Sequence, residues 1–193
     1  MNYTKLSLRE VTTALHDVAK AAKSTFGALD RRQLNWRPNA KQWSVAQCFE
    51  HLLTANALVL RAAEHALTNP PDNIWQRLPL LPAIHGWLLI RSQAPNTKQK
   101  FTAPSRARPS KSEISEDVIQ RFVDQHLRAA EWVRPLDDAS LGRSIMVSPF
   151  VKVVSYSVLD GLRLVVAHDW RHFEQARRVM LSPGFPPGVR STS

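Results

Sequence analysis

The sequence predicts an all-α protein whose helices form a four-helix bundle. Apolar residues recur at steps of three and four in four long segments, which is the spacing of one face of an amphipathic helix. No segment alternates apolar and polar residues as a half-buried strand does. The chain has 193 residues, enough for one domain with a hydrophobic core. Four long helices in one domain favour a bundle. We place this domain at 1–181 and expect a flexible, proline- and glycine-rich tail at 182–193.

The first two helices have clear boundary signals. We expect the first helix to cover about 7–28, with Gly27 marking its end. Ser44 and Gln47 have the spacing of a capping box, in which each side chain bonds a backbone N–H at the start of a helix. The second helix is therefore expected to begin at Ser44 and to continue to about Leu67, where a proline-rich sequence stops it.

The last two helices also have polar caps. The third is predicted to begin at Ser112 or Ser115 and to end before a proline. The fourth begins after Ser155 or Ser157 and continues to Leu181. Both boundaries follow from polar residues that directly precede an apolar pattern of helical spacing.

Residues 70–110 form a long crossover between the second and third helices. The sequence indicates a short helix near 84–90 and a loop after it. A connection of this length is unusual in a compact domain and is typical of segments that shape a pocket. It would also allow the second and fourth helices to run in the same direction.

The chain is basic, with a formal net charge of +10. Six lysines and arginines between 91 and 111 have no acidic residue among them, in a segment interrupted by proline and serine. We interpret this segment as solvated loop surface. A basic chain can bind nucleic acid, anionic lipid or an anionic small molecule, and net charge alone does not distinguish among these partners.

The cysteine content and the apolar segments also indicate the cellular compartment in which the protein is expected. Cys48 has no second cysteine with which to form an intrachain disulfide. The N-terminal sequence lacks the apolar stretch of a signal peptide. The longest apolar stretch, 78–90, is too short to span a bilayer and contains two prolines. We therefore expect a cytoplasmic protein without a membrane partner.

Three histidines are the strongest candidates for a functional site. His168 and His172 are four residues apart in the fourth helix, so their rings share one face, roughly 6 Å apart at Cβ. His51 lies on a mostly apolar stripe of the second helix, so all three rings are expected to point into the bundle. Three neutral imidazoles with one open position form the ligand set of some catalytic zinc sites. From spacing alone, hydrogen-bonded core histidines remain an open alternative.

Other residues near these histidines have simpler interpretations. Cys48, one turn before His51, could be a thiolate ligand but is better interpreted as a small buried apolar residue. Asp169 follows His168 as glutamate follows the first histidine of the zinc-peptidase sequence H-E-x-x-H, but no third ligand lies downstream. We exclude a peptidase and interpret Asp169 either as assisting a metal-bound water or, more simply, as a solvent-facing charge. Among the other histidines, expected to be solvated or structural, His126 is the best candidate for an occasional fourth ligand.

Two parts of the chain together resemble the signatures of the DinB-like superfamily. The first is Leu34–Pro38 followed by Trp43–Leu52, and the second is Ser148–Phe150 followed by Ala167–Arg178. The resemblance spans the chain from about Leu6 to Leu181, and each signature lies on the helix where the family has it.

The resemblance implies a fold and a metal site. It implies a bundle in up-down-down-up order with a divalent metal, zinc or nickel, in its core. His51, His168 and His172 match the family's three histidine ligands, and Gln175 matches a polar position one turn beyond the last ligand. Asp169 stands where many members have glutamate, which weakens a catalytic role for this carboxylate. The resemblance also implies a homodimer.

Three functions compete at this stage. The first is a metal-dependent enzyme that activates a thiol or water, because some members of the family resemble transferases or isomerases that use a low-molecular-weight thiol and others are regarded as hydrolases. The second is a non-catalytic metal-binding or stress-response module on the same fold. The third is a nucleic-acid-binding protein, which ranks last because no helix-turn-helix, zinc finger or interleaved aromatic and basic surface is present. Basic residues near the site would favour an anionic substrate.

Overall fold

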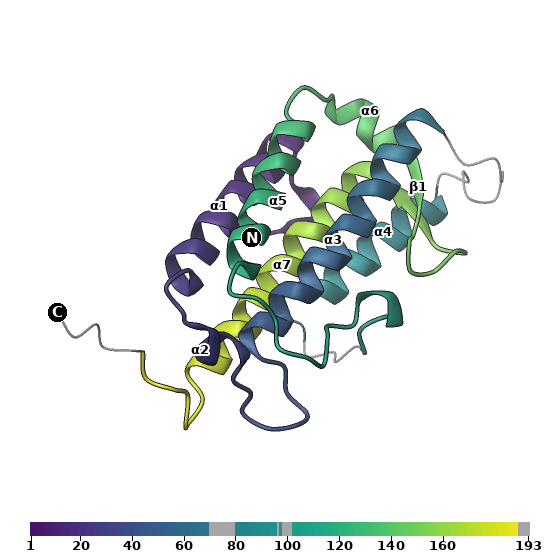
Figure 1. Ribbon diagram of the computed structural model, residues 1–193. Coiled ribbons are helices and arrows are strands. Elements are labelled where there is room, and N and C mark those ends of the chain that lie inside the picture. Colours follow the sequence, from purple (N-terminus) through teal and green to yellow (C-terminus); the bar gives the residue numbers. More distant parts are fainter. Residues whose placement is uncertain (70–79, 96, 98–101, 189–193) are drawn as a thin grey trace.

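The computed structural model describes residues 1–69, 80–95, 97 and 102–188. Figure 1 shows long helices packed side by side, with α1 beside α5 and α3 beside α7. The helices of the bundle are α1 (Leu8–Phe26), α3 (Val45–Thr68), α5 (Val118–Val133) and α7 (Val158–Met180). The predicted four-helix bundle is confirmed.

The helices follow the up-down-down-up order. One cluster of buried apolar side chains combines the first halves of α1 and α7 with the second halves of α3 and α5, and a second cluster combines the opposite halves. The expectation that the two histidine-bearing helices run in the same direction is therefore wrong. α3 and α7 are antiparallel, and the long crossover instead makes α3 parallel to α5. As a result, the start of α3 lies at the level of the end of α7.

A further helix, α4 (Leu80–Gln93), packs against α7 on the outside of the bundle. It is longer than the short helix predicted near 84–90. Its outer side exposes several large apolar side chains, and the Arg91 guanidinium lies 4.6 Å from the centroid of the Trp87 ring. Residues 70–79 and 98–101 of the predicted crossover lie outside the described residues.

The short elements precede the bundle helices or connect them. They are η1 (Tyr3–Lys5), α2 (Arg31–Asn35), η3 (Ser105–Ala107), α6 (Asp138–Arg143) and the antiparallel strands β1 (Ile145–Val147) and β2 (Ser155–Ser157). The sequence predicted no strand, because three-residue strands are too short to show alternation. Gly161 accommodates this hairpin, since a Cβ added there would lie 2.7 Å from the sulfur of Met146.

The predicted boundaries are confirmed for three of the bundle helices. The capping box of Ser44 and Gln47 begins α3, Gly27 is the C-cap of α1, and the Ser157 hydroxyl accepts a bond from a backbone N–H at the start of α7. The third prediction is wrong, because α5 begins at Val118. The backbone N–H and C=O of Ile114 both bond to the side chain of Asn35, so this segment satisfies its backbone without a helix.

The described part of the predicted tail packs against α2. Gln33 Nε2 donates to the carbonyl of Pro186 at 3.0 Å, and the rings of Trp36 and Phe185 meet edge to face. Residues 189–193 lie outside the described part of the chain. Among the described helices, none combines the length and apolar character needed to cross a bilayer.

Candidate metal centre

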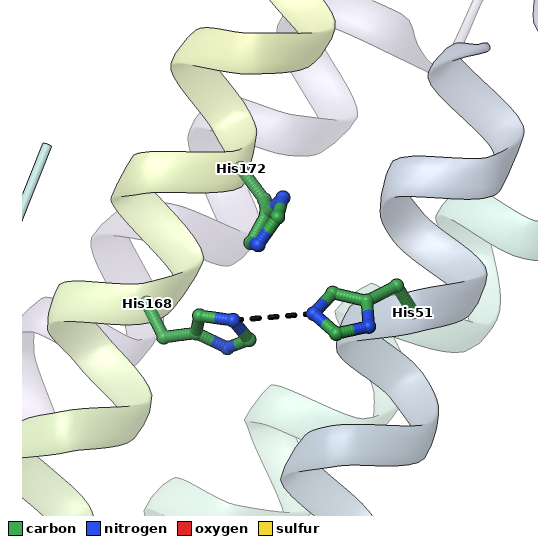
Figure 2. A group of neighbouring side chains, drawn as sticks. All are labelled: His51, His168 and His172. Atoms are coloured by element: carbon green, nitrogen blue, oxygen red, sulfur yellow. Dashed lines mark hydrogen bonds between the residues drawn. The ribbon is translucent and has the colours of Figure 1, made fainter. Parts of the chain in front are cut away.

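The rings of His51, His168 and His172 point toward one another between α3 and α7 (Figure 2). One ring nitrogen from each lies within 4.8 Å of the other two. Nε2 of His51 and Nε2 of His168 are 3.2 Å apart. Two nitrogens that share a tetrahedral zinc ion at the usual bond length are roughly 3.4 Å apart. The structure therefore brings together the three histidines that the sequence singled out.

The antiparallel pairing of α3 and α7 explains this convergence. His51 lies in the second turn of α3, whose start is fixed by the capping box at Ser44. His168 and His172 lie near the middle of α7 and share one face, because four residues make about one helical turn.

The tautomer of His51 is fixed by the loop that follows α4. Its Nδ1 lies 2.6 Å from the carbonyl oxygen of Ala107, which can only accept, so Nδ1 donates and Nε2 carries the lone pair. The loop is itself attached to α3, because Gln47 Nε2 donates to the carbonyl of Ser110 at 2.8 Å and the Glu50 carboxylate accepts the Ser110 N–H. Such a backbone partner orients a metal-binding imidazole.

All three histidines are held in the neutral form. Burial lowers the pKa of His51, and burial together with the nearby rings of His172 and His51 and the Arg171 charge lowers the pKa of His168 well below its usual value. The pKa of His172 falls to about 3, mainly through burial and then through the charges of His51 and Arg171. A metal binds neutral imidazole, so the protein environment favours the binding form.

His172 shows a further feature that suits a metal site. Its Nδ1 is buried and has no hydrogen-bond partner among the described residues. Gln175, one turn beyond, interacts with the His172 side chain and partly opposes the lowering of its pKa. A buried polar atom without a partner is costly in a folded protein. The three-histidine set therefore fits a divalent cation, which would satisfy nitrogens that otherwise face one another.

The surroundings of the histidines include residues that the sequence analysis did not assign to the site. The ring of Trp43 stacks on His172 at 5.7 Å between centroids and lies 5.1 Å from the ring of His51. Arg171 and Arg178 supply positive charge that lowers the pKa of His172. The signal for Trp43 was its place directly before the cap of the His51 helix, and the signal for Arg171 was its place between the two histidines of α7.

Asp169 does not face solvent, which corrects the simpler interpretation given above. Its side chain is fully buried. Asn56 Nδ2 donates to one carboxylate oxygen at 2.8 Å, and Nε2 of His126 lies 2.7 Å from the other. His126 is likewise buried and belongs to this network. The sequence missed the network because its partners lie on three different helices.

Cys48 is a core residue. It is fully buried among apolar side chains, and burial raises the pKa of its thiol to about 12. We therefore expect the native protein not to react with a thiol-specific disulfide reagent at pH 8, and to react with one equivalent after unfolding in denaturant. A Cys48→Ala variant should retain the metal content of the parent protein. Fast labelling of the folded chain would contradict this assignment.

Comparisons with known proteins bear on the fold and the family of this chain. No curated protein matches the sequence. Among solved structures, the chain is similar to YfiT from Bacillus subtilis, described as a probable metal-dependent hydrolase with an unusual four-helix bundle topology. The TM-score is 0.62 at 16% sequence identity, and the match covers 93% of this chain and 89% of that one. The model of the DinB superfamily matches residues 14–176, which include all three histidines and all four bundle helices in whole or in large part. The chain therefore belongs to the DinB superfamily.

Proposed function

We propose that this protein is a metal-dependent enzyme in which His51, His168 and His172 hold a divalent metal ion between α3 and α7. The observation that carries the proposal is the convergence of three ring nitrogens within 4.8 Å. Burying three imidazoles together is unfavourable unless their polar atoms find partners. A shared cation supplies that partner for all three at once. Imidazole ligands suit zinc and nickel, which we propose as the metals.

The residues around the site each have a role in this proposal. When bound, a divalent metal with three neutral ligands and an open position acts as a Lewis acid that activates water or holds a thiol as thiolate near neutral pH. Ala107 orients His51 through its carbonyl. The indole of Trp43 covers the rings of His51 and His172 and excludes water from that side.

The charges near the site favour an anionic substrate. Arg171 and Arg178 both act on His172, and the Asp169 carboxylate on α7 is fully buried and bonded to other side chains. Positive charge beside a site raises the local concentration of anions. We propose a small anionic molecule, with a low-molecular-weight thiol as one candidate. Trp43 offers an apolar surface for the uncharged part of such a molecule.

Two reaction classes fit this site, and one experiment separates them. The purified protein is depleted with a chelator, reloaded with zinc or nickel, and assayed in two ways: for transfer of small thiols to an aromatic halide, and for hydrolysis of chromogenic esters. We expect turnover in one assay that is lost with the chelator and restored by metal. Metal binding without turnover in either assay would favour a non-catalytic module. Failure to bind any divalent metal would refute the proposal.

A further inference from the structure

A buried polar network lies on α3, α5 and α7, beside the histidine cluster. It consists of Asn56, Asp169 and His126, whose side chains are 1%, 0% and 1% exposed. Asp169 is the sequence neighbour of His168, and Asn56 follows His51 by five residues on α3. The network therefore attaches both histidine-bearing helices to each other and to α5.

The hydrogen bonds of His126 fix where its protons lie. Its Nδ1 is 2.8 Å from the carbonyl oxygen of Phe122, which can only accept, so Nδ1 carries a proton. The contact of 2.7 Å between Nε2 and the second Asp169 oxygen then holds one further proton. The pair therefore shares one proton in a buried hydrogen bond between α5 and α7.

Stability alone gives little reason for such a network. Burying a carboxylate is costly, and replacing a buried ion pair with well-packed apolar side chains is often neutral or stabilising. The adjoining bundle core is mainly apolar and includes the phenylalanines near the start of α5. A carboxylate kept beside a cation-binding cluster is better explained by its effect on the cation.

We propose that Asp169, held by Asn56 and His126, is a positioning residue of the metal centre. It sets the spacing of α3 and α7 at the level of the histidines, and it places a negative charge behind them that stabilises a bound cation. Partners that bond directly to the ligands typically change metal affinity by about 10–100-fold, and we take the same range for Asp169, which is the chain neighbour of His168. This inference rests on the proposed metal-binding function and identifies what tunes it.

The test is the Asp169→Asn variant, which removes the charge but keeps the shape. Zinc affinity is measured by competition with a chromogenic chelator, and thermal unfolding of the metal-free protein is followed by circular dichroism. We expect affinity to fall by about 10–100-fold, and the visible spectrum of the cobalt-loaded protein to change. The matched control is Tyr156→Phe, which removes a buried hydroxyl group from β2, in the apolar cluster that contains the first half of α7. It should leave zinc affinity within about twofold, since it touches no part of the network.

A double variant tests whether the residues act as a unit. If they do, Asp169→Asn combined with His126→Gln should bind zinc about as well as Asp169→Asn alone, because contacts in one network are not additive. Should Asp169→Asn fail to fold, Asn56→Ala is the second variant, which removes one bond to the carboxylate and is expected to weaken zinc binding. Unchanged zinc affinity in a folded Asp169→Asn or Asn56→Ala protein would overturn this inference and leave the metal site intact. Absence of zinc binding by the parent protein would instead refute the proposed function.

Discussion

The His172→Ala protein is expected to bind zinc or nickel at least about 100-fold more weakly than the parent chain, because losing a ligand should exceed the 10–100-fold effect of losing a partner beyond the ligands. The remaining pair, His51 and His168, leaves a metal with too few protein ligands for a stable tetrahedral site. Metal content after dialysis against a weak chelator, measured by mass spectrometry, checks this directly. Any catalytic turnover should be lost in parallel.

A matched control removes a histidine from the same fold without touching the site. His65 lies on α3, as His51 does, but its side chain is exposed. The His65→Ala protein should keep the metal content and affinity of the parent. Equal metal content in the His172→Ala and parent proteins would show that the histidine cluster is not the binding site.

The stability of the metal-free protein is expected to fall steeply as the pH drops below 6.5. The pKa values of His51, His168 and His172 all lie below 6.5 in the folded chain, that of His172 at about 3. Below pH 6.5 the unfolded chain therefore binds protons that the folded chain excludes, and acid favours unfolding. The contribution of these three histidines to the free energy of unfolding is fully present above this pH and is lost progressively toward pH 3. Each excluded proton contributes a slope of about 1.4 kcal/mol per pH unit.

The His172→Ala variant isolates this effect from the rest of the chain. The charges that act on His172, those of His51, Arg171 and Arg178, all disfavour its protonated form. Its removal should reduce the slope between pH 5 and 6 by about 1.4 kcal/mol per pH unit. Urea unfolding at several pH values measures both slopes, and this range lies above the titration of most carboxylates. Identical slopes for the two proteins would show that His172 titrates normally in the folded chain.

Local signals in the sequence predicted most of the bundle. Spacing and caps located α1, α3 and α7, because a helix boundary such as Ser44 with Gln47 depends only on nearby residues. The start of α5 was misplaced, because Asn35, far away in the chain, satisfies the backbone of Ile114. The relative direction of α3 and α7 was also misjudged from the crossover, since loop length does not determine which way a helix packs.

Only part of the candidate site could be predicted, because only part of it depends on local sequence patterns. The pair at His168 and His172 is a local pattern, the apolar stripe of the second helix indicated that His51 points inward, and the resemblance then matched all three to metal ligands. The environment of Asp169 could not be predicted, because its partners Asn56 and His126 come from two other helices. An aspartate beside a histidine pair has the same local sequence whether it faces solvent or the core.

The two sides of the histidine cluster come from distant parts of the chain. His51 and His168 are 117 residues apart, so a cation bound to both acts as a reversible cross-link between the second bundle helix and the last. Its contribution to folding depends on supply: at a free metal concentration 100 times the dissociation constant, linkage adds about 2.7 kcal/mol to the stability. A nascent chain lacks this cross-link until the last bundle helix has been synthesised, so metal availability would act on the assembled bundle rather than on its early stages.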